Sequence, residues 1–173
     1  MTIYSLVGLI AAIALVVTAI RYFIARPDKV WVAYIQDFVG VFFIFSGAVK
    51  AIDPLGTAYK MTDYFNEFDM GFLEPYTVGF AVFMIVLEIA LGFALILNYA
   101  RYLTLFLYTG MILFFTFLTG YTSYTGNVTD CGCFGDFIKL KPIQSFYKDV
   151  FLTVLISLVI YSPAILTGHG RPF

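Results

Sequence analysis

The sequence predicts an all-α integral membrane protein with five transmembrane helices and one amphipathic helix at the membrane surface. The chain has 173 residues, of which 61% are hydrophobic and only 12% are charged, and its mean hydropathy is +0.92. Soluble domains carry about 25% charged residues. A chain of this length could not bury so much apolar surface in one water-soluble core, which places it in a membrane.

Five apolar segments are long enough to cross about 30 Å of hydrocarbon at about 1.5 Å per residue. They run approximately over residues 3–24, 31–52, 76–97, 101–121 and 149–167. None of them alternates with the period of a membrane β-strand, which leaves helices as the spanning element. The whole chain, 1–173, is therefore predicted to form a single membrane domain.

The first segment resembles a secretory signal but is predicted to be a retained transmembrane helix. Residues 3–24 have no basic region before them. Their apolar run is also longer than the roughly 7–15 residues of a signal sequence's hydrophobic region.

An amphipathic helix is predicted between the second and third spans. Asp53 followed by Pro54 is a favourable helix start, since Asp caps the helix and Pro suits its first position. Apolar or weakly polar residues then recur every three or four positions, while charged and amide side chains take the other side. The first set is Leu55, Ala58, Tyr59, Thr62, Phe65 and Phe68, and the second is Lys60, Asp63, Asn66 and Glu67. Such a helix lies along the membrane surface, here packed over the end of the bundle.

Glycines within the spans are predicted to let neighbouring helices approach closely, because lipid removes the hydrophobic drive that packs helices in water. The candidates are Gly40, Gly47, Gly79, Gly92 and Gly110.

The charges that flank the spans predict an orientation in a bacterial cytoplasmic membrane. If five spans alternate, one side carries Arg21, Arg26, Lys29, Arg101 and Arg171, and the other carries Lys50, Lys60, Lys139, Lys141 and Lys148. The totals are equal, but the arginines sit in very short turns, where the positive-inside rule is strongest. The second side also holds eight acidic residues: Asp53, Asp63, Glu67, Asp69, Glu74, Asp130, Asp136 and Asp149. We therefore expect the arginine side in the cytoplasm and the loops 53–75 and 122–148 in the periplasm.

The only two cysteines, Cys131 and Cys133, stand one residue apart in the polar stretch "TDCGCFGD", residues 129–136. A disulfide between them closes a small strained ring, which the intervening glycine makes possible. Strained and exposed disulfides exchange readily with other thiols, whereas a structural disulfide normally closes a long loop. Reversible dithiol–disulfide exchange is therefore the leading hypothesis. Two free thiols or an inert local brace are the alternatives.

A metal site at the cysteines is disfavoured, because it needs further ligands. The only histidine, His169, falls on the opposite side of the membrane in the predicted topology.

Three charged residues lie in the second and third spans. Glu88 is in the middle of the third span, at a cost of about 3 kcal/mol on insertion scales. It is interpreted either as a hydrogen-bonding group between helices or as a proton acceptor. Asp37 enters the second span early, and Lys50 ends it, where the lysine could extend to the interface as an ordinary anchor. No His, Asp or Glu ladder continues from Glu88, which weakens the case for a proton wire.

These pieces together resemble the DoxX-like membrane family, in particular its MauE branch. The matching stretches are "GVFFIFSGAVKAIDPLGTAYK" at 40–60, "VLEIALG" at 86–92 and "CGCFGD" at 131–136. The resemblance covers residues 31–167 and implies a four-helix transmembrane bundle, to which this chain adds the helix at 3–24. It also implies thioredoxin-like partners outside the cytoplasmic membrane, with Cys131 and Cys133 as the redox pair. Lys50 and Glu88 would be polar residues typical of the family.

The leading functional hypothesis is a thiol–disulfide oxidoreductase that passes electrons between a thioredoxin-like protein and a membrane carrier such as a quinone. Thiol oxidases that use quinones carry a second cysteine pair as a relay, which this chain lacks, so its single pair would do both tasks. The alternative is a non-catalytic subunit that stabilises a larger membrane complex. An ion or solute transporter that uses Glu88 ranks third. No cluster of Lys or Arg suggests nucleic-acid binding.

Overall fold

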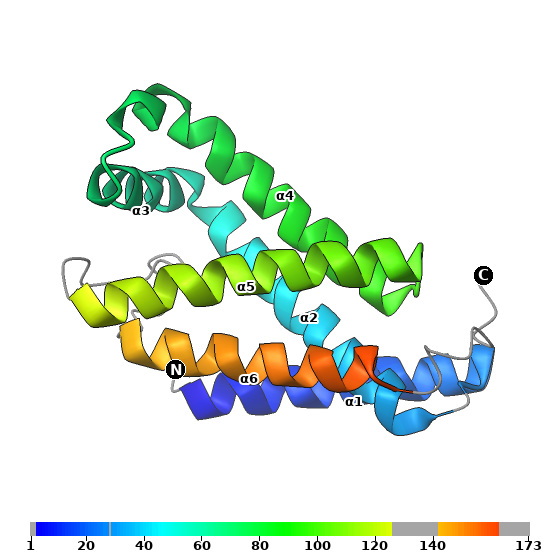
Figure 1. Ribbon diagram of the computed structural model, residues 1–173. Coiled ribbons are helices and arrows are strands. Elements are labelled where there is room, and N and C mark those ends of the chain that lie inside the picture. The colour runs from blue at the N-terminus through cyan, green and yellow to red at the C-terminus, as the bar shows by residue number, and fades with distance from the viewer. Residues whose placement is uncertain (1–2, 28, 126–141, 163–173) are drawn as a thin grey trace.

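The computed structural model describes residues 3–27, 29–125 and 142–162. Within them the chain forms six α-helices and one short 3₁₀ helix (Figure 1). These elements are α1 (Ile3–Ala25), α2 (Val30–Ile52), α3 (Pro54–Glu67), η1 (Gly71–Tyr76), α4 (Thr77–Ile96), α5 (Arg101–Thr125) and α6 (Pro142–Ile160). Five helices are long and apolar enough to cross a membrane, as predicted. The prediction of an all-α membrane protein with an additional N-terminal helix and a short amphipathic helix is confirmed.

Helix α2 forms the centre of the bundle. In its spanning segment 67% of residues are buried inside the protein, against 17% to 33% in the other four. It crosses diagonally between its neighbours and packs against α1, α4 and α6 (Figure 1). Because α2 meets protein rather than lipid on most of its surface, it is the helix on which polar side chains can be buried together.

The helix order places the connections at two ends of the bundle. The α1–α2 and α4–α5 turns lie at one end, called here the turn end (Figure 1). Helix α3 lies at the opposite end, where α5 ends and α6 begins; this is called the α3 end. Arg21, Arg26, Lys29 and Arg101 are near the turn end, and Lys50, Lys60 and Lys148 are toward the α3 end. This separation of the described basic residues agrees with the sequence prediction.

Helix α3 begins as predicted. Asp53 caps it by accepting a hydrogen bond from the backbone N–H of Gly56 at 2.9 Å, with Pro54 at the first position. Aromatic residues at the C-terminal end of α3 pack against the bundle. The ring of Phe65 packs edge-on against that of Phe80 of α4, and the ring centre of Phe68, just after the helix, lies 4.8 Å from that of Tyr121 of α5. Leu55 and Tyr59 instead point outward, toward the surroundings of the bundle.

The glycine prediction is confirmed at the crossing of α2 and α4. A Cβ atom on Gly92 would lie 2.7 Å from the carbonyl oxygen of Gly40, and one on Gly47 would lie 2.6 Å from Ile89. The two backbones can therefore approach only because these residues lack side chains. The prediction is wrong for Gly79 and Gly110, where no atom of the described chain is within 4 Å of an added Cβ.

The boundaries of the last connection differ from the prediction. The sequence suggested a loop over 122–148, but α5 continues to Thr125 and α6 already begins at Pro142. The predicted start of the last helix at residue 149 was too late because Ser145 and Lys148 look like loop residues. In the fold these polar residues occupy the first turns of a helix whose opening proline is favoured at that position.

Candidate functional site

The two intramembrane charges that the sequence singled out, Lys50 and Glu88, form a buried ion pair. Lys50 comes from the last turn of α2 and Glu88 from the middle of α4. The Nζ atom of Lys50 donates to Oε2 of Glu88 at 2.7 Å, and their side chains are 7% and 3% exposed. The interpretation of Lys50 as an anchor that extends to the interface is wrong, because Glu88 draws its ammonium group inward.

The ammonium group of Lys50 has a second stabilising contact. It lies over the ring of Phe115 of α5, 4.8 Å from the ring centre, within the range of a cation–π interaction. A charge in this position requires such partners, since an unpaired buried ion costs several kcal/mol.

A second ion pair, which the sequence did not predict, faces the first from α6. Nζ of Lys148 lies 3.0 Å from Oδ1 of Asp149. The other carboxylate oxygen of Asp149, Oδ2, accepts a hydrogen bond of 3.1 Å from Thr119 of α5. The side chain of Asp149 is only 1% exposed. Its carboxylate is thus held between a lysine of its own helix and a hydroxyl of the neighbouring one.

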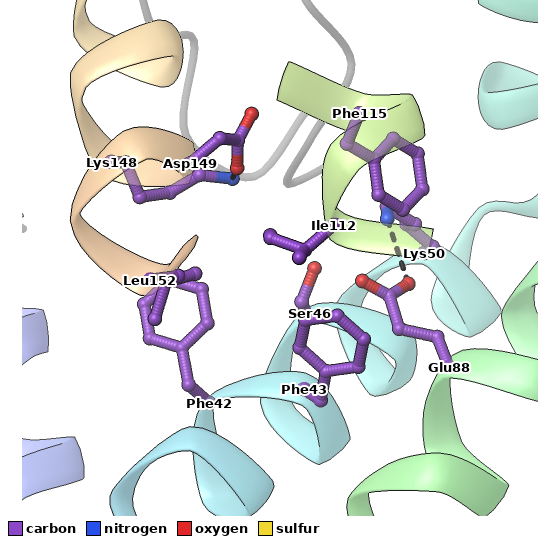
Figure 2. Close-up of a pocket in the computed structure, with 10 residues that line it drawn as sticks. All are labelled: Phe42, Phe43, Ser46, Lys50, Glu88, Ile112, Phe115, Lys148, Asp149 and Leu152. Atoms are coloured by element: carbon purple, nitrogen blue, oxygen red, sulfur yellow. Dashed lines mark hydrogen bonds and ion pairs between the residues drawn. The ribbon is translucent and has the colours of Figure 1, made fainter. Parts of the chain in front are cut away.

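Both ion pairs line one small cavity (Figure 2). Four helices contribute to it, and Ser46 of α2 points toward its centre between the two carboxylates. Apolar side chains complete its wall: Phe42, Phe43, Ile112, Phe115 and Leu152. The cavity measures about 10 Å³, roughly the space of one water molecule. Two lysines and two acidic residues therefore share a confined polar space inside an otherwise apolar bundle.

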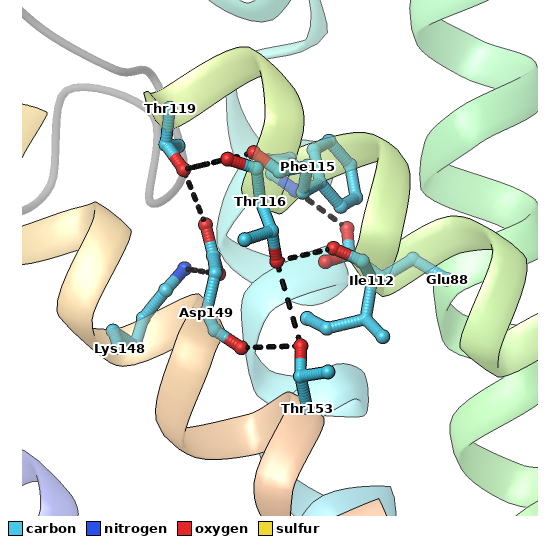
Figure 3. Close-up of polar contacts among 9 residues, drawn as sticks. Glu88, Ile112, Phe115, Thr116, Thr119, Lys148, Asp149 and Thr153 are labelled. Atoms are coloured by element: carbon cyan, nitrogen blue, oxygen red, sulfur yellow. Dashed lines mark hydrogen bonds and ion pairs between the residues drawn. The ribbon is translucent and has the colours of Figure 1, made fainter. Parts of the chain in front are cut away.

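A row of hydroxyl groups accompanies Asp149 between α5 and α6 (Figure 3). On α5, Thr116, Thr119 and Thr122 recur every three residues; on α6, Ser145, Asp149 and Thr153 recur every four. These spacings put each set on one face of its helix. The hydroxyls of Thr116 and Thr153 approach to 3.5 Å across the interface, and Thr153 also donates to the backbone oxygen of Asp149 at 2.8 Å. We call these six residues the polar seam.

Asp37, the third charged residue predicted within a span, does not join this cluster. It lies in the part of α2 that is nearer the turn end, and its side chain is fully buried. Its Oδ1 accepts a hydrogen bond from Arg21, and its Oδ2 accepts one of 2.9 Å from Thr18. Both donors come from α1. The Asp37 carboxylate therefore ties α1 to α2 rather than serving the cavity.

The predicted redox residues Cys131 and Cys133 lie outside the residues that the structure describes. Their segment follows the last residue of α5 and precedes the first residue of α6, so it is joined to the bundle at the α3 end. Asp149 lies seven residues after Pro142, about two helical turns into α6. The polar cluster thus begins about two turns below the point where the cysteine-containing segment enters α6.

The sequence placed Asp149 at the first position of the last span and counted it only among the acidic residues of one side, so its place beside the cavity was missed. No acidic or histidine ladder was expected to continue from Glu88, but a second carboxylate, from another helix, lines the same cavity. The spacing Ser145–Asp149–Thr153 was the signal that could have revealed it, since polar residues at four-residue intervals indicate one face of a helix.

The cavity limits what this cluster can bind. With the volume of about one water molecule, it does not admit a quinone ring. Within the described residues there is no group of three or more His, Cys, Asp or Glu side chains that could hold a metal ion. What this arrangement can do chemically is bind a water molecule and accept or release a proton.

Comparison with known proteins places the chain beside a family of membrane proteins. The family model for methylamine utilisation protein MauE matches residues 28–162. Protein TlpB of Flavobacterium psychrophilum is 29% identical over 130 residues, which covers 70% of this chain and 34% of TlpB. The chain therefore spans about a third of the length of this curated relative. No solved structure matches the chain.

Proposed function

The chain belongs to the family of methylamine utilisation protein MauE, and from this premise we propose that it is a membrane-embedded thiol–disulfide redox protein. Cys131 and Cys133 exchange a disulfide with a thioredoxin-like protein outside the cytoplasmic membrane. The pair then exchanges electrons with a membrane carrier of the quinone class. In this account the α3 end of the bundle faces the periplasm.

The observation that carries this proposal is the placement of both cysteines of the chain on either side of a single glycine. A disulfide between residues so close in sequence gains little from constraining the unfolded chain, so a structural role explains it poorly. Its small ring is strained, and strained disulfides are the ones that exchange. The membrane-spanning helices supply the second requirement, access to a lipid-soluble carrier.

The reaction balances with a single cysteine pair. A thiolate of the reduced partner attacks the Cys131–Cys133 disulfide and forms a mixed disulfide; the second partner thiol then resolves it. The partner leaves oxidised and the pair becomes a dithiol. The dithiol gives two electrons and two protons to the quinone, which becomes a quinol, and the Cys131–Cys133 disulfide forms again.

The test is an assay with the purified chain in lipid nanodiscs, a thioredoxin-fold protein with a reduced Cys-x-x-Cys pair, and ubiquinone-1. We expect quinol formation that depends on the chain and is lost in Cys131→Ser and in Cys133→Ser. The matched control is Ser123→Ala, which alters a small polar residue of α5 and leaves both thiols in place. Equal quinol formation by Cys131→Ser and the parent chain would show that the pair does not carry the electrons. The non-catalytic subunit would then be the better account.

A further inference from the structure

Helix α2 fixes the start of α5 at the turn end of the bundle (Figure 1). The side chain of Gln36 donates hydrogen bonds to the backbone oxygen of Leu95 at 2.8 Å and to Oδ1 of Asn98 at 3.3 Å. Asn98 has a positive φ angle of 54°, so the chain turns sharply there, and α5 begins three residues later at Arg101. The position of Arg101 is therefore set by the central helix of the bundle.

The next residue of α2 holds a second arginine at the same end. Asp37 follows Gln36, and its fully buried carboxylate accepts a hydrogen bond from Nη1 of Arg21 on α1. The charges of Arg21 and Arg101 lie close enough to repel each other. Like charges held together away from bulk water repel strongly unless an anion balances them.

Only one of these two guanidinium groups has a carboxylate partner in the described part of the chain. Arg21 is paired with Asp37. The side chain of Arg101 is partly buried, and its Nε has no hydrogen-bond partner among the described residues. It takes part in none of the ion pairs formed between them. A guanidinium group has five N–H donors, and leaving a buried charged donor unsatisfied is costly. The surroundings of Arg101 therefore favour binding of an anion.

The described charges near Arg101 also favour an anion. Arg21, Arg26, Lys29 and Arg101 lie toward the turn end, and the one described acidic residue there is Asp37. The other described acidic residues lie in α3, near it, or toward the α3 end of the bundle. The positive charge at the turn end is thus balanced only in part by the chain that the structure describes.

The residues next to Arg101 indicate that the anion belongs to a lipid. Arg101 is the first residue of a helix that is long and apolar enough to cross a membrane, and the neighbouring Tyr99 and Tyr102 are exposed. Exposed tyrosines are typical of the headgroup level of a bilayer, where lipid phosphates lie. A planar guanidinium group can donate two parallel hydrogen bonds to a phosphate. The exposed side chain of Leu103 adds apolar surface for an acyl chain, which a free phosphate ion would not use.

We propose that Arg101, together with Arg21, binds the phosphate group of an anionic phospholipid in the leaflet at the turn end. This site is independent of the proposed redox function. The phosphate accepts hydrogen bonds from the Arg101 guanidinium and balances the positive charge that Asp37 leaves uncompensated. Because Arg21 belongs to α1 and Arg101 to α5, one lipid headgroup links the additional N-terminal helix to the rest of the bundle.

The test measures lipid binding to the purified full chain by native mass spectrometry. Dioleoylphosphatidylglycerol is the anionic probe and dioleoylphosphatidylcholine is the zwitterionic one. We expect the parent chain to bind phosphatidylglycerol more tightly. Arg101→Gln should weaken this binding about tenfold, the effect of losing a charge-assisted hydrogen bond. Arg26→Gln removes the same charge from an exposed residue at the same end and is the matched control. It should change the binding by less than about twofold.

Asp37→Asn provides a second measurement that a purely structural role for the arginines does not predict. In this variant Arg21 loses its carboxylate and becomes available to the phosphate. Phosphatidylglycerol binding should therefore become about fivefold tighter, the effect of one more basic charge at a membrane surface. Circular dichroism of each variant verifies that its helices are intact. Weaker binding than in the parent chain would contradict a site that Arg21 shares.

Three further results would overturn the site. Equal losses in Arg101→Gln and Arg26→Gln would mean that overall charge, and not a particular residue, attracts the lipid. Equal binding of the two lipids by the parent chain would mean that the charge of the headgroup is not recognised. Displacement of the lipid by an equal concentration of glycerophosphoglycerol, the same headgroup without acyl chains, would make the ligand a soluble phosphate. The assay of the cysteine pair is unaffected by any of these results.

Discussion

Helix α2 contributes to two buried ion pairs with different surroundings, one at each end of the helix. Toward the turn end, Asp37 receives hydrogen bonds from Arg21 and Thr18 of α1. Toward the α3 end, Lys50 pairs with Glu88 of α4 and lines a cavity together with a second ion pair from α6. Both acidic side chains are almost fully buried. Burial of a charge therefore does not by itself distinguish an attachment between helices from a chemical site.

The difference lies in the surroundings of each pair. The Asp37 pair joins α2 to a helix that precedes residues 28–162, the part of the chain that the family model matches. The Lys50–Glu88 pair lies inside that part, and the groups around it come from four helices. The first pair is explained by attachment of α1. The second has a neighbouring carboxylate, a row of hydroxyls and space for water, which attachment does not require.

Removing one partner of the Lys50–Glu88 pair should have the largest effect on stability. Glu88→Gln leaves a buried ammonium group without its counter-ion and should lower the free energy of unfolding by about 3–5 kcal/mol. Titration with a denaturing detergent, read by circular dichroism, measures this loss. Glu74→Gln, an exposed acidic residue, is the control and should change little.

The double variant Lys50→Met/Glu88→Leu sharpens this prediction. Replacing a buried ion pair with apolar residues of similar volume is often neutral for stability, so the double variant should unfold close to the parent. If it is as unstable as Glu88→Gln, loss of the counter-ion is not the cause.

Asp37→Asn should have a smaller effect, about 1–3 kcal/mol. Its partner Arg21 is 17% exposed near the turn end, so the guanidinium group can turn toward water when the carboxylate is lost. The attachment of α1 weakens, but the quinone-dependent reoxidation of the dithiol should persist. A loss of reoxidation in Asp37→Asn would remove the distinction between the two ends of α2.

Between the two pairs, the crossing of α2 and α4 holds both ends in place. Gly92→Ala puts a Cβ atom 2.7 Å from the carbonyl oxygen of Gly40 and should destabilise the bundle by about 1–3 kcal/mol through overpacking. Gly79→Ala, in the same helix but with nothing within 4 Å, is the matched control. It should be neutral or should stabilise by up to about 1 kcal/mol. Equal unfolding transitions for the two variants would contradict the close crossing.

The smallest effect is expected within the polar seam. Thr119→Val removes the hydrogen bond to Asp149, and hydrogen bonds between membrane helices contribute about 0.6 kcal/mol on average. Thr109→Val is the control, since Thr109 donates to a carbonyl of its own helix, that of Leu105. A larger loss of stability in Thr109→Val than in Thr119→Val would argue against the α5–α6 contact.

The sequence predicted the bundle more completely than the site. Apolar length located all five spanning helices, and the Asp53–Pro54 pair located the start of α3, because both signals are local in the chain. Glu88 was identified by its cost in hydrocarbon and Lys50 by its place at the end of a span, but their pairing across two helices was not predicted. Asp149 was expected at the very start of the last span, since the polar residues after Pro142 concealed the start of α6. The Lys50–Glu88 contact joins residues that are 38 positions apart in the sequence, and the Thr119–Asp149 contact joins residues that are 30 apart. Such contacts depend on how the helices cross, which local sequence patterns do not encode.

The central claim is that Cys131 and Cys133 form a working redox pair, and acid-quenched alkylation of intact cells tests it most directly. The redox state of the two thiols is read by gel shift in the parent chain and in Cys133→Ser, with Ser123→Ala as the matched variant. The account predicts a pair that changes state when the cells are given an oxidant or a reductant. It also predicts a mixed disulfide trapped on Cys131 in Cys133→Ser, with a thioredoxin-fold protein as the attached partner. A pair that stays in one state under both treatments and traps nothing would contradict the account.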